Sequence, residues 1–190
     1  MMKQNDPHHA ELNALAARAE ASGADGAPVE RWNPPHCGEI DMRIAADGRW
    51  FYNGTTIDRP ALVRLFASVL KIEEDGETYL VTPAEKLRIT VEDAHFIAVE
   101  VARSYEDGVQ VLTFRTNIGD VVRAGPDRPV RLSEDVEAGF CPYLVVRRGL
   151  TAKVTRAVAL ELAAMLEDDD AGTFLTSDGA RFYGPKAERA

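Results

Sequence analysis

Several features common in proteins are scarce in this sequence of 190 residues. Its two cysteines, Cys37 and Cys141, are too few for a disulfide framework and do not stand at zinc-ligand spacing. No run approaches the roughly 18 uninterrupted apolar residues that a membrane span needs. The N-terminal region lacks the basic stretch and apolar stretch of an export signal. The sequence therefore predicts a cytoplasmic protein with no membrane span and with reduced thiols.

Positive charge is also in deficit, because 22 Lys and Arg stand against 31 Asp and Glu and give a formal net charge of −9. A field of that sign repels phosphate backbones, which excludes nucleic acid as the main partner. A single nucleotide needs only two or three local hydrogen-bond donors, so the negative net charge does not exclude it as a ligand. The sequence shows no glycine-rich phosphate loop, serine elbow or paired-histidine helix, so it predicts no cofactor, no metal site and no catalytic residue. Whether the protein is an enzyme is left open, with a binding protein favoured.

The order of the predicted elements indicates an α+β fold with two lobes. Residues 1–27 are predicted to be a flexible N-terminal arm with a short helix at Ala10–Glu20. Residues 28–85 are predicted to form an N-terminal α+β lobe, and residues 86–190 a β-rich C-terminal lobe.

The N-terminal lobe is predicted to begin with a hairpin, because Asp47-Gly48 separates the alternating stretch Ile40–Ile44 from Trp50–Tyr52. Asp58 is predicted to cap a helix that has Pro60 in its first turn and apolar residues at helical spacing as far as Leu70. The helix is expected to end in the acidic turn 73–76, and a strand at Thr78–Thr82 follows.

The C-terminal lobe begins with a run of strands between Leu87 and Leu132. Such a meander is expected to curl into a bent antiparallel sheet or a partial barrel. The spacing of apolar residues predicts a capping helix at Thr151–Leu166, and Ser177-Asp178-Gly179 predicts a closing hairpin.

One combination of elements occurs twice. With a shift of 96 residues, the helix from Leu62 to Leu70 falls on the stretch from Val158 to Leu166, and an acidic glycine turn follows each. An aromatic strand, Thr78-Tyr79-Leu80 or Thr173-Phe174-Leu175, comes next. Any amphipathic helix before a glycine turn looks similar, but the match continues into the strand and favours a duplicated strand-helix unit.

Several short motifs stand together in the sequence: Trp32-Asn33-Pro34-Pro35-His36-Cys37-Gly38, Ile40-Asp41-Met42-Arg43-Ile44, Asp47-Gly48-x-Trp50, Thr82-Pro83-x-Glu85-Lys86, Val91-Glu92-Asp93 and Thr116-Asn117. Together these motifs resemble those of the bacterial DUF1285 family. The resemblance implies two lobes with a duplicated core, a C-terminal lobe like pleckstrin-homology domains, and a ligand site at the seam between the lobes. It also implies a nucleotide-like ligand and a signalling role. This chain departs from many relatives in having His95 where they have proline.

The segment from Trp32 to Gly38 is a candidate binding segment, since two prolines hold it extended and fix the geometry of its side chains. Trp32 can stack on a base and Asn33 can read its edge, or Trp32 can simply anchor the start of the domain. Cys37 is either a ligand contact, a buried inert thiol or a nucleophile, and His95 is the one candidate base for the last role.

Further candidates lie near the expected seam. Lys86 can balance a phosphate and Thr82 can face the same place, or both can belong to a solvated turn. Arg59 stands at a helix start, where its charge opposes the dipole, so a seam carboxylate or a ligand phosphate is expected to hold it. Thr116 and Asn117 either contact a sugar or base, or form an Asx-turn without a ligand.

The sequence thus favours a ligand-sensing or signalling protein that binds a nucleotide-like molecule at the seam. The predicted ligand-binding residues are Trp32, Asn33, Cys37, Arg59, Thr82, Lys86, Thr116 and Asn117. The alternative is a protein–protein interaction module that uses the curved C-terminal sheet. The sequence does not indicate an oligomeric state.

Overall fold

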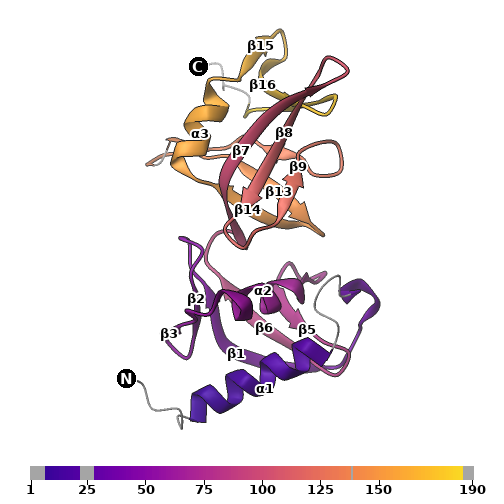
Figure 1. Cartoon of the computed structure of the whole chain (residues 1–190), viewed down its shortest axis with the longest axis vertical. Helices are drawn as coiled ribbons and strands as arrows, with labels where there is room; N and C mark the ends of the chain where they lie inside the picture. Colours follow the sequence, from indigo (N-terminus) through magenta and orange to yellow (C-terminus); the bar gives the residue numbers. More distant parts are fainter. Residues whose placement is uncertain (1–6, 22–27, 138, 186–190) are drawn as a thin grey trace. The chain divides into compact units, whose positions relative to one another are not determined.

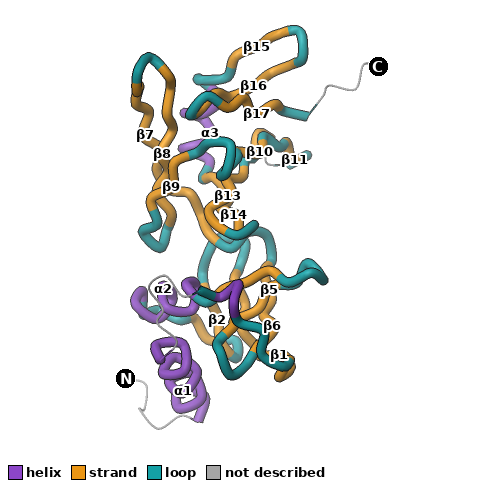
Figure 2. The backbone as a smooth tube through the Cα atoms, turned by 90° about the vertical axis from the view of Figure 1, so that its right-hand side faces the viewer, coloured by secondary structure: helices purple, strands orange, loops and turns teal. Residues whose placement is uncertain are grey.

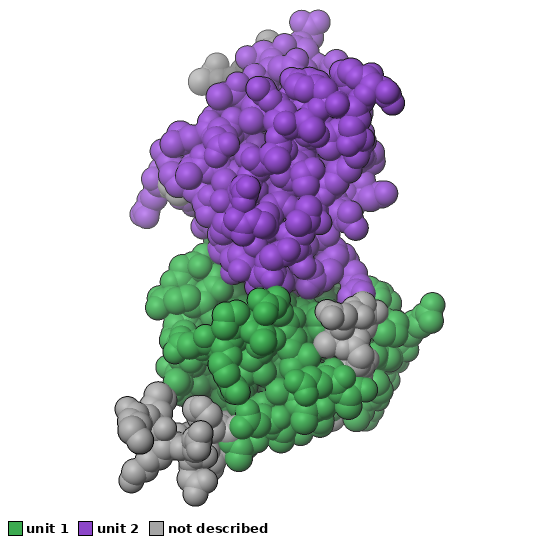
Figure 3. Space-filling model, viewed as in Figure 1, with its two compact units in different colours: residues 1–93 green, residues 94–190 purple. Residues whose placement is uncertain are grey.

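The computed structural model describes residues 7–21, 28–137 and 139–185, without the side chains of residues 7–9, 36 and 37. Two compact units divide the chain, Met1–Asp93 and Ala94–Ala190 (Figure 3). The sequence places the boundary between residues 85 and 86 instead. The difference arises because strand β6 (Lys86–Val91) pairs with β1 and β5 of the first unit. Within the described residues, no helix has the length and apolarity to cross a membrane.

The first unit is built on a mixed sheet with the strand order β3-β2-β1-β6-β5-β4. Its strands are β1 (His36–Ile44), β2 (Trp50–Tyr52), β3 (Thr55–Thr56), β4 (Leu70–Ile72), β5 (Thr78–Val81) and β6, preceded by the short 3-10 helix η1 (Val29–Arg31). The predicted hairpin is confirmed, since Ile44 pairs with Trp50 across the turn at Gly48, whose φ is 83°. Among the described strand pairs of this sheet, β1 and β6 run parallel and the others antiparallel.

Helix α2 (Pro60–Ser68) lies over the sheet of the first unit (Figure 1). Its buried Phe66 stacks on Trp50 of β2, with the ring centres 6.5 Å apart. The prediction that Asp58 caps this helix is wrong, because Pro60 takes the first helical position and leaves Arg59 as the N-cap residue. The predicted helix was also too long, since Leu70–Ile72 leaves it to pair with β5.

Helix α1 (Pro7–Ala21) packs on α2 and includes the helix predicted at Ala10–Glu20. The sequence predicts a flexible arm here, whereas Leu12, Leu15 and Ala19 of α1 are buried. Polar contacts add to this packing, because Tyr52 donates a hydrogen bond to Glu11 and Arg18 pairs with Glu85. The first unit therefore includes α1, which lies beside α2 on the same side of the sheet (Figure 2).

The second unit contains a six-stranded sheet with the order β10-β13-β14-β7-β8-β9, curled into a half-barrel as predicted. The sheet is mixed and not antiparallel as the sequence predicts, because β14 runs parallel to β7. The strands are β7 (Phe96–Glu106), β8 (Val109–Thr116), β9 (Val121–Arg123), β10 (Val130–Arg131), β13 (Tyr143–Arg147) and β14 (Leu150–Val154), and a small hairpin joins β11 (Glu134–Asp135) and β12 (Gly139–Phe140). A second sheet holds β15 (Glu167–Asp169), β16 (Gly172–Ser177) and β17 (Ala180–Tyr183).

Helix α3 (Arg156–Ala163) is shorter than the helix predicted at Thr151–Leu166. The first part of that stretch is strand β14, in which Leu150, Ala152 and Val154 are buried in alternation. Thr155 begins the helix, because its hydroxyl accepts a hydrogen bond from the backbone of Val158 at 3.4 Å.

The two units share a succession of elements. A hairpin, a helix and three strands follow one another as β1-β2-α2-β4-β5-β6, interrupted by the two-residue β3, and again as β13-β14-α3-β15-β16-β17. The acidic turns that the sequence pairs therefore join β4 to β5 and β15 to β16. The strands pair differently in the two units, because β4–β6 join the sheet of β1 and β2, whereas β15–β17 form a sheet of their own. The duplicated unit therefore stays a prediction.

Candidate functional site

The eight predicted ligand residues divide between the units. Trp32, Asn33, Cys37, Arg59, Thr82 and Lys86 lie in the first unit, and Thr116 and Asn117 lie in the second. Each unit contains a separate polar cluster around some of these residues.

Trp32 and Lys86 are connected through Lys71 and Glu73, which the sequence did not predict as ligand residues. Lys71 donates a hydrogen bond to the Trp32 carbonyl at 3.5 Å. The ammonium groups of Lys71 and Lys86 lie 3.2 and 3.5 Å from one oxygen of Glu73. Because both lysines already face a carboxylate, that carboxylate competes with any anionic ligand here.

The neighbouring Tyr79 completes this cluster. Its ring centre lies 5.0 Å from the Lys86 ammonium, and its hydroxyl donates to Asp75 at 2.7 Å. The hydrogen bond to the Asp75 carboxylate raises the pKa of Tyr79 to about 12. Tyr79 thus stays protonated and is a poor acid or base near neutral pH.

The other candidates of the first sheet have different surroundings. Asn33 is exposed, and Cys37 lies in β1 next to His36, whose backbone pairs with Lys86. Thr82 is buried, and its hydroxyl accepts a hydrogen bond from the backbone of Glu85 at 3.2 Å. The Thr82 side chain therefore stabilises the turn between β5 and β6.

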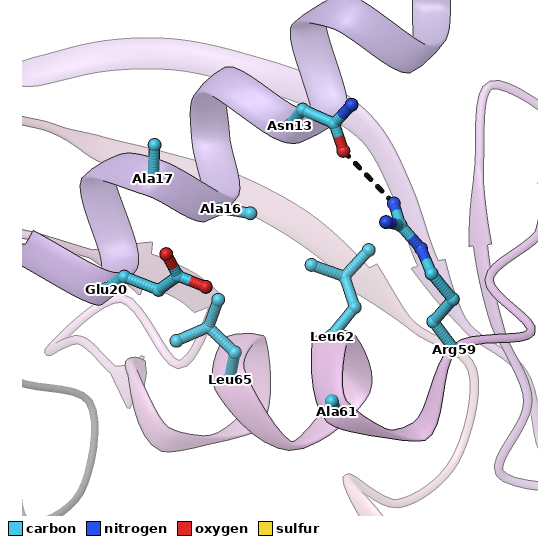
Figure 4. A pocket seen from close by; sticks show the side chains of 8 residues that line it. All are labelled: Asn13, Ala16, Ala17, Glu20, Arg59, Ala61, Leu62 and Leu65. Carbon is cyan, nitrogen blue, oxygen red and sulfur yellow. Dashed lines mark hydrogen bonds between the residues drawn. The ribbon is translucent and has the colours of Figure 1, made fainter. Parts of the chain in front are cut away.

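Arg59 lies at the edge of a hollow between α1 and α2 (Figure 4). The hollow has a volume of about 320 Å³. Its lining residues are Asn13, Ala16, Ala17, Glu20, Arg59, Ala61, Leu62 and Leu65. Alanines on the facing surfaces of the two helices leave this space, and Leu62 and Leu65 give it an apolar floor.

The polar groups of the hollow stand at its two ends (Figure 4). At one end, the Arg59 guanidinium donates a hydrogen bond to the Asn13 amide oxygen at 3.1 Å. In the part of the chain that the structure describes, Arg59 forms no ion pair. The Glu20 carboxylate stands at the opposite end, near Leu65. A ligand with an anionic group and a hydrogen-bond donor at opposite ends of an apolar body suits this arrangement.

Thr116 and Asn117 hold the turn between β8 and β9 in the second unit. The Thr116 hydroxyl accepts a hydrogen bond from the backbone of Asp120 at 3.0 Å, and the Asn117 side chain accepts one from Ile97 at 3.0 Å. Arg147 then pairs with the Asp120 carboxylate. Thr116 thus bonds the backbone of its own turn, whereas Asn117 does not form the expected Asx-turn, because its side chain accepts from β7 instead. The ligand roles of both residues stay predictions.

His95 lies beside this turn and is almost fully buried. Its Nδ1 accepts a hydrogen bond from the backbone of Thr151 at 3.2 Å. Burial and the nearby Arg147 guanidinium lower the pKa of His95 to about 4. A base with that pKa takes a proton from a thiol poorly, which weighs against the nucleophile interpretation of Cys37. Among the described residues, no group of three or more metal-ligating side chains gathers.

Acid is expected to destabilise the second unit through His95. An exposed histidine has a pKa of about 6.5, so the folded state binds this proton less readily than the unfolded state. The contribution of neutral His95 to the free energy of unfolding is complete above about pH 6.5 and is lost as the pH falls toward 4. Denaturant unfolding at pH 7 and pH 5 should therefore show a smaller loss of free energy for H95N than for the unchanged protein. An equal loss in both would contradict the assignment.

Comparison with known proteins gives matches over both units. The N-terminal domain model of the DUF1285 family matches residues 27–94, and the C-terminal domain model of the same family matches residues 95–183. Both are described as domains or proteins of unknown function. A search of curated proteins yields no match.

Two solved structures are similar to this chain. A DUF1285 family protein from Silicibacter pomeroyi DSS-3 is 48% identical, with 89% of this chain and 93% of that chain covered and a TM-score of 0.82. A DUF1285 family protein from Shewanella baltica OS155 is 31% identical, with 66% of this chain and 91% of that chain covered and a TM-score of 0.53.

Proposed function

We propose that this member of the DUF1285 family is a ligand-sensing protein that binds a mononucleotide in the hollow between α1 and α2. The chain belongs to that family because it matches both of its domain models. The observation that carries the proposal is Arg59. Its guanidinium lies at the edge of the hollow with a neutral amide as its hydrogen-bond partner, which leaves its charge for a phosphate.

The helix beneath Arg59 favours the same ligand. Arg59 is the N-cap residue of α2, and among the described residues no side chain forms a capping hydrogen bond at this end of the helix. Pro60 has no N–H, and the N–H groups of Leu62 and Val63 donate to the Arg59 carbonyl, so the Ala61 N–H and the positive end of the helix dipole are what the helix adds to the guanidinium.

The volume and the far end of the hollow restrict the ligand further. About 320 Å³ is at the lower limit of ligand pockets, which suits a mononucleotide better than a dinucleotide. The base then lies over Leu62 and Leu65, and its exocyclic amine donates a hydrogen bond to Glu20. Adenosine monophosphate (AMP) has this amine, and inosine monophosphate (IMP) has an oxygen in its place.

A thermal-shift series with AMP, IMP and adenosine triphosphate (ATP) tests the proposal. AMP is expected to raise the melting temperature, because a ligand at a hundredfold excess over its Kd stabilises the folded state by about 2.7 kcal/mol. IMP should give a smaller shift than AMP, because it lacks the amine that donates to Glu20. ATP should also give a smaller shift, because its additional negative charge is repelled by a chain of net charge −9. No shift with any of the three would overturn the proposal, and equal shifts with AMP and IMP would overturn the role of Glu20.

A second candidate function is an interaction module with a pleckstrin-homology-like C-terminal unit. The observation in its favour is that residues 100–106 of β7 pair with β8 on one side and with no other described strand on the other, although Thr155 and α3 lie beside β7 near Ala98. An uncovered strand edge can receive a strand from a partner. This function predicts a stable complex together with no response to nucleotides.

A further inference from the structure

Helix α1 forms one wall of the hollow but stands outside the core of the first unit. It supplies the lining residues Asn13, Ala16, Ala17 and Glu20, and α2 with its N-cap residue supplies the others. The model of the family's N-terminal domain matches residues 27–94, so the family domain is defined without α1. The stack of Phe66 on Trp50 joins α2 to the sheet without α1 as well. Detachment of α1 would therefore leave the rest of the unit folded.

A narrow apolar face holds α1 in place. Its large apolar side chains are Leu12 and Leu15, with 7% and 5% of their surface accessible. The other buried side chains described for this helix are those of Ala16 and Ala19, which bury little area. A helix of 15 residues is marginal in water without packing. The docking of α1 thus depends largely on two leucines.

The polar contacts of α1 add little to this docking. Glu11 accepts a hydrogen bond from Tyr52, and Asn13 accepts one from the guanidinium at the edge of the hollow. Arg18 forms an ion pair with Glu85. All three contacts are exposed, and exposed pairs contribute little to stability because water and salt screen them.

We infer that α1 is a latch that a bound nucleotide holds closed on α2. The inference rests on the proposed function, in which the phosphate binds Arg59 beside α2 and the base binds Glu20 of α1. A ligand that contacts both helices binds the closed form more tightly than the open form, and it shifts the equilibrium toward the closed form. The coupling is reciprocal, so a change that opens α1 must also weaken nucleotide binding.

The open form exposes apolar surface that the closed form covers. Leu62 and Leu65 of α2 point toward α1 across the hollow (Figure 4). Opening uncovers these two side chains together with Leu12 and Leu15 of α1. The nucleotide therefore controls the exposure of a contiguous apolar surface, and such a surface is typical of interaction sites.

Hydrogen exchange, measured by mass spectrometry, follows the latch directly. Without AMP, the central amides of α1 should exchange faster than those of β6, because α1 can open while the sheet stays folded. With AMP at a hundredfold excess over its Kd, exchange in α1 should slow about a hundredfold, and exchange in α3 should not change. Exchange in α1 as slow as in β6 without AMP, or an unchanged rate with AMP bound, would overturn the latch.

The variant L15A separates the latch from the nucleotide site, because Leu15 is buried but does not line the hollow. It should speed exchange in α1 without AMP and raise the Kd for AMP at least tenfold, since the measured Kd is the intrinsic value divided by the closed fraction. Saturating AMP should restore slow exchange in α1. Retained protection of β6 shows that the variant is folded.

The matched control is L160A, because Leu160 is 60% accessible and lies on α3 in the second unit. Equal Kd values for L15A and L160A would contradict the latch. The failures of the two proposals are distinguishable by calorimetry on the unchanged protein. If AMP does not bind, the proposed function fails and the latch fails with it. If AMP binds but exchange in α1 does not respond, the nucleotide site stands and the latch fails.

Discussion

Replacing Arg59 with alanine is expected to weaken AMP binding by tenfold to a hundredfold. A hydrogen bond between a charged donor and a charged acceptor contributes about 1.5–3 kcal/mol, and each 1.4 kcal/mol changes Kd tenfold. The variant removes the one charged group that the proposal assigns to the phosphate. Isothermal titration calorimetry with AMP, at fixed ionic strength, measures the change.

The matched control for this variant is R64A. Arg64 also lies in α2 and is exposed, but it does not line the hollow. Both variants remove one positive charge from the same helix, so a general electrostatic effect would weaken AMP binding equally in both. Equal losses would therefore contradict the assignment of Arg59, as would a normal affinity in R59A.

The variant S177A is expected to lower the free energy of unfolding of the second unit by about 2–4 kcal/mol. Ser177 is fully buried and connects two segments. Its hydroxyl accepts a hydrogen bond from the Leu112 N–H at 2.9 Å and donates one to the Ala124 carbonyl at 2.8 Å. Alanine leaves both buried backbone groups without this partner, and each such loss costs roughly 1–3 kcal/mol.

Denaturant unfolding, monitored by circular dichroism, measures this loss. S104A is the control, because Ser104 is exposed on the projecting part of β7 and its change should alter the free energy of unfolding by less than about 0.5 kcal/mol. If S177A were as stable as S104A, the arrangement of β16 against β8 would be wrong.

The sequence predicted the fold best where a local turn decides the structure. Asp47-Gly48 and Ser177-Asp178-Gly179 identify two hairpins, because Gly48, Asp178 and Gly179 adopt the positive φ that tight turns require. The boundaries of the helices were harder to predict. Leu150, Ala152 and Val154 have the period of two of a strand, but they precede a helix with buried residues of its own, and the two patterns merge into one apparent helix.

The candidate site was only partly accessible to sequence reasoning. Arg59 was identified because a positive charge at a helix start opposes the dipole. Asn13 and Glu20 were missed, since Leu12 and Leu15 are the large apolar residues of α1 and the rest of the helix resembles a solvated segment. The signal that was present is the pair of small residues Ala16 and Ala61, which lie on facing helices and leave space between them. Which helices face each other depends on tertiary packing, which the local pattern does not reveal.

The central claim is that the space between α1 and α2 binds a mononucleotide. Methyl NMR spectra of protein labelled at alanine and leucine, recorded during a titration with AMP, test it most directly. If AMP binds in the hollow, the methyl chemical shifts of Ala16, Leu62 and Leu65 change during the titration, while those of Leu112 and Leu162 in the second unit do not. Unchanged signals in the hollow, or shifts confined to the second unit, would contradict it.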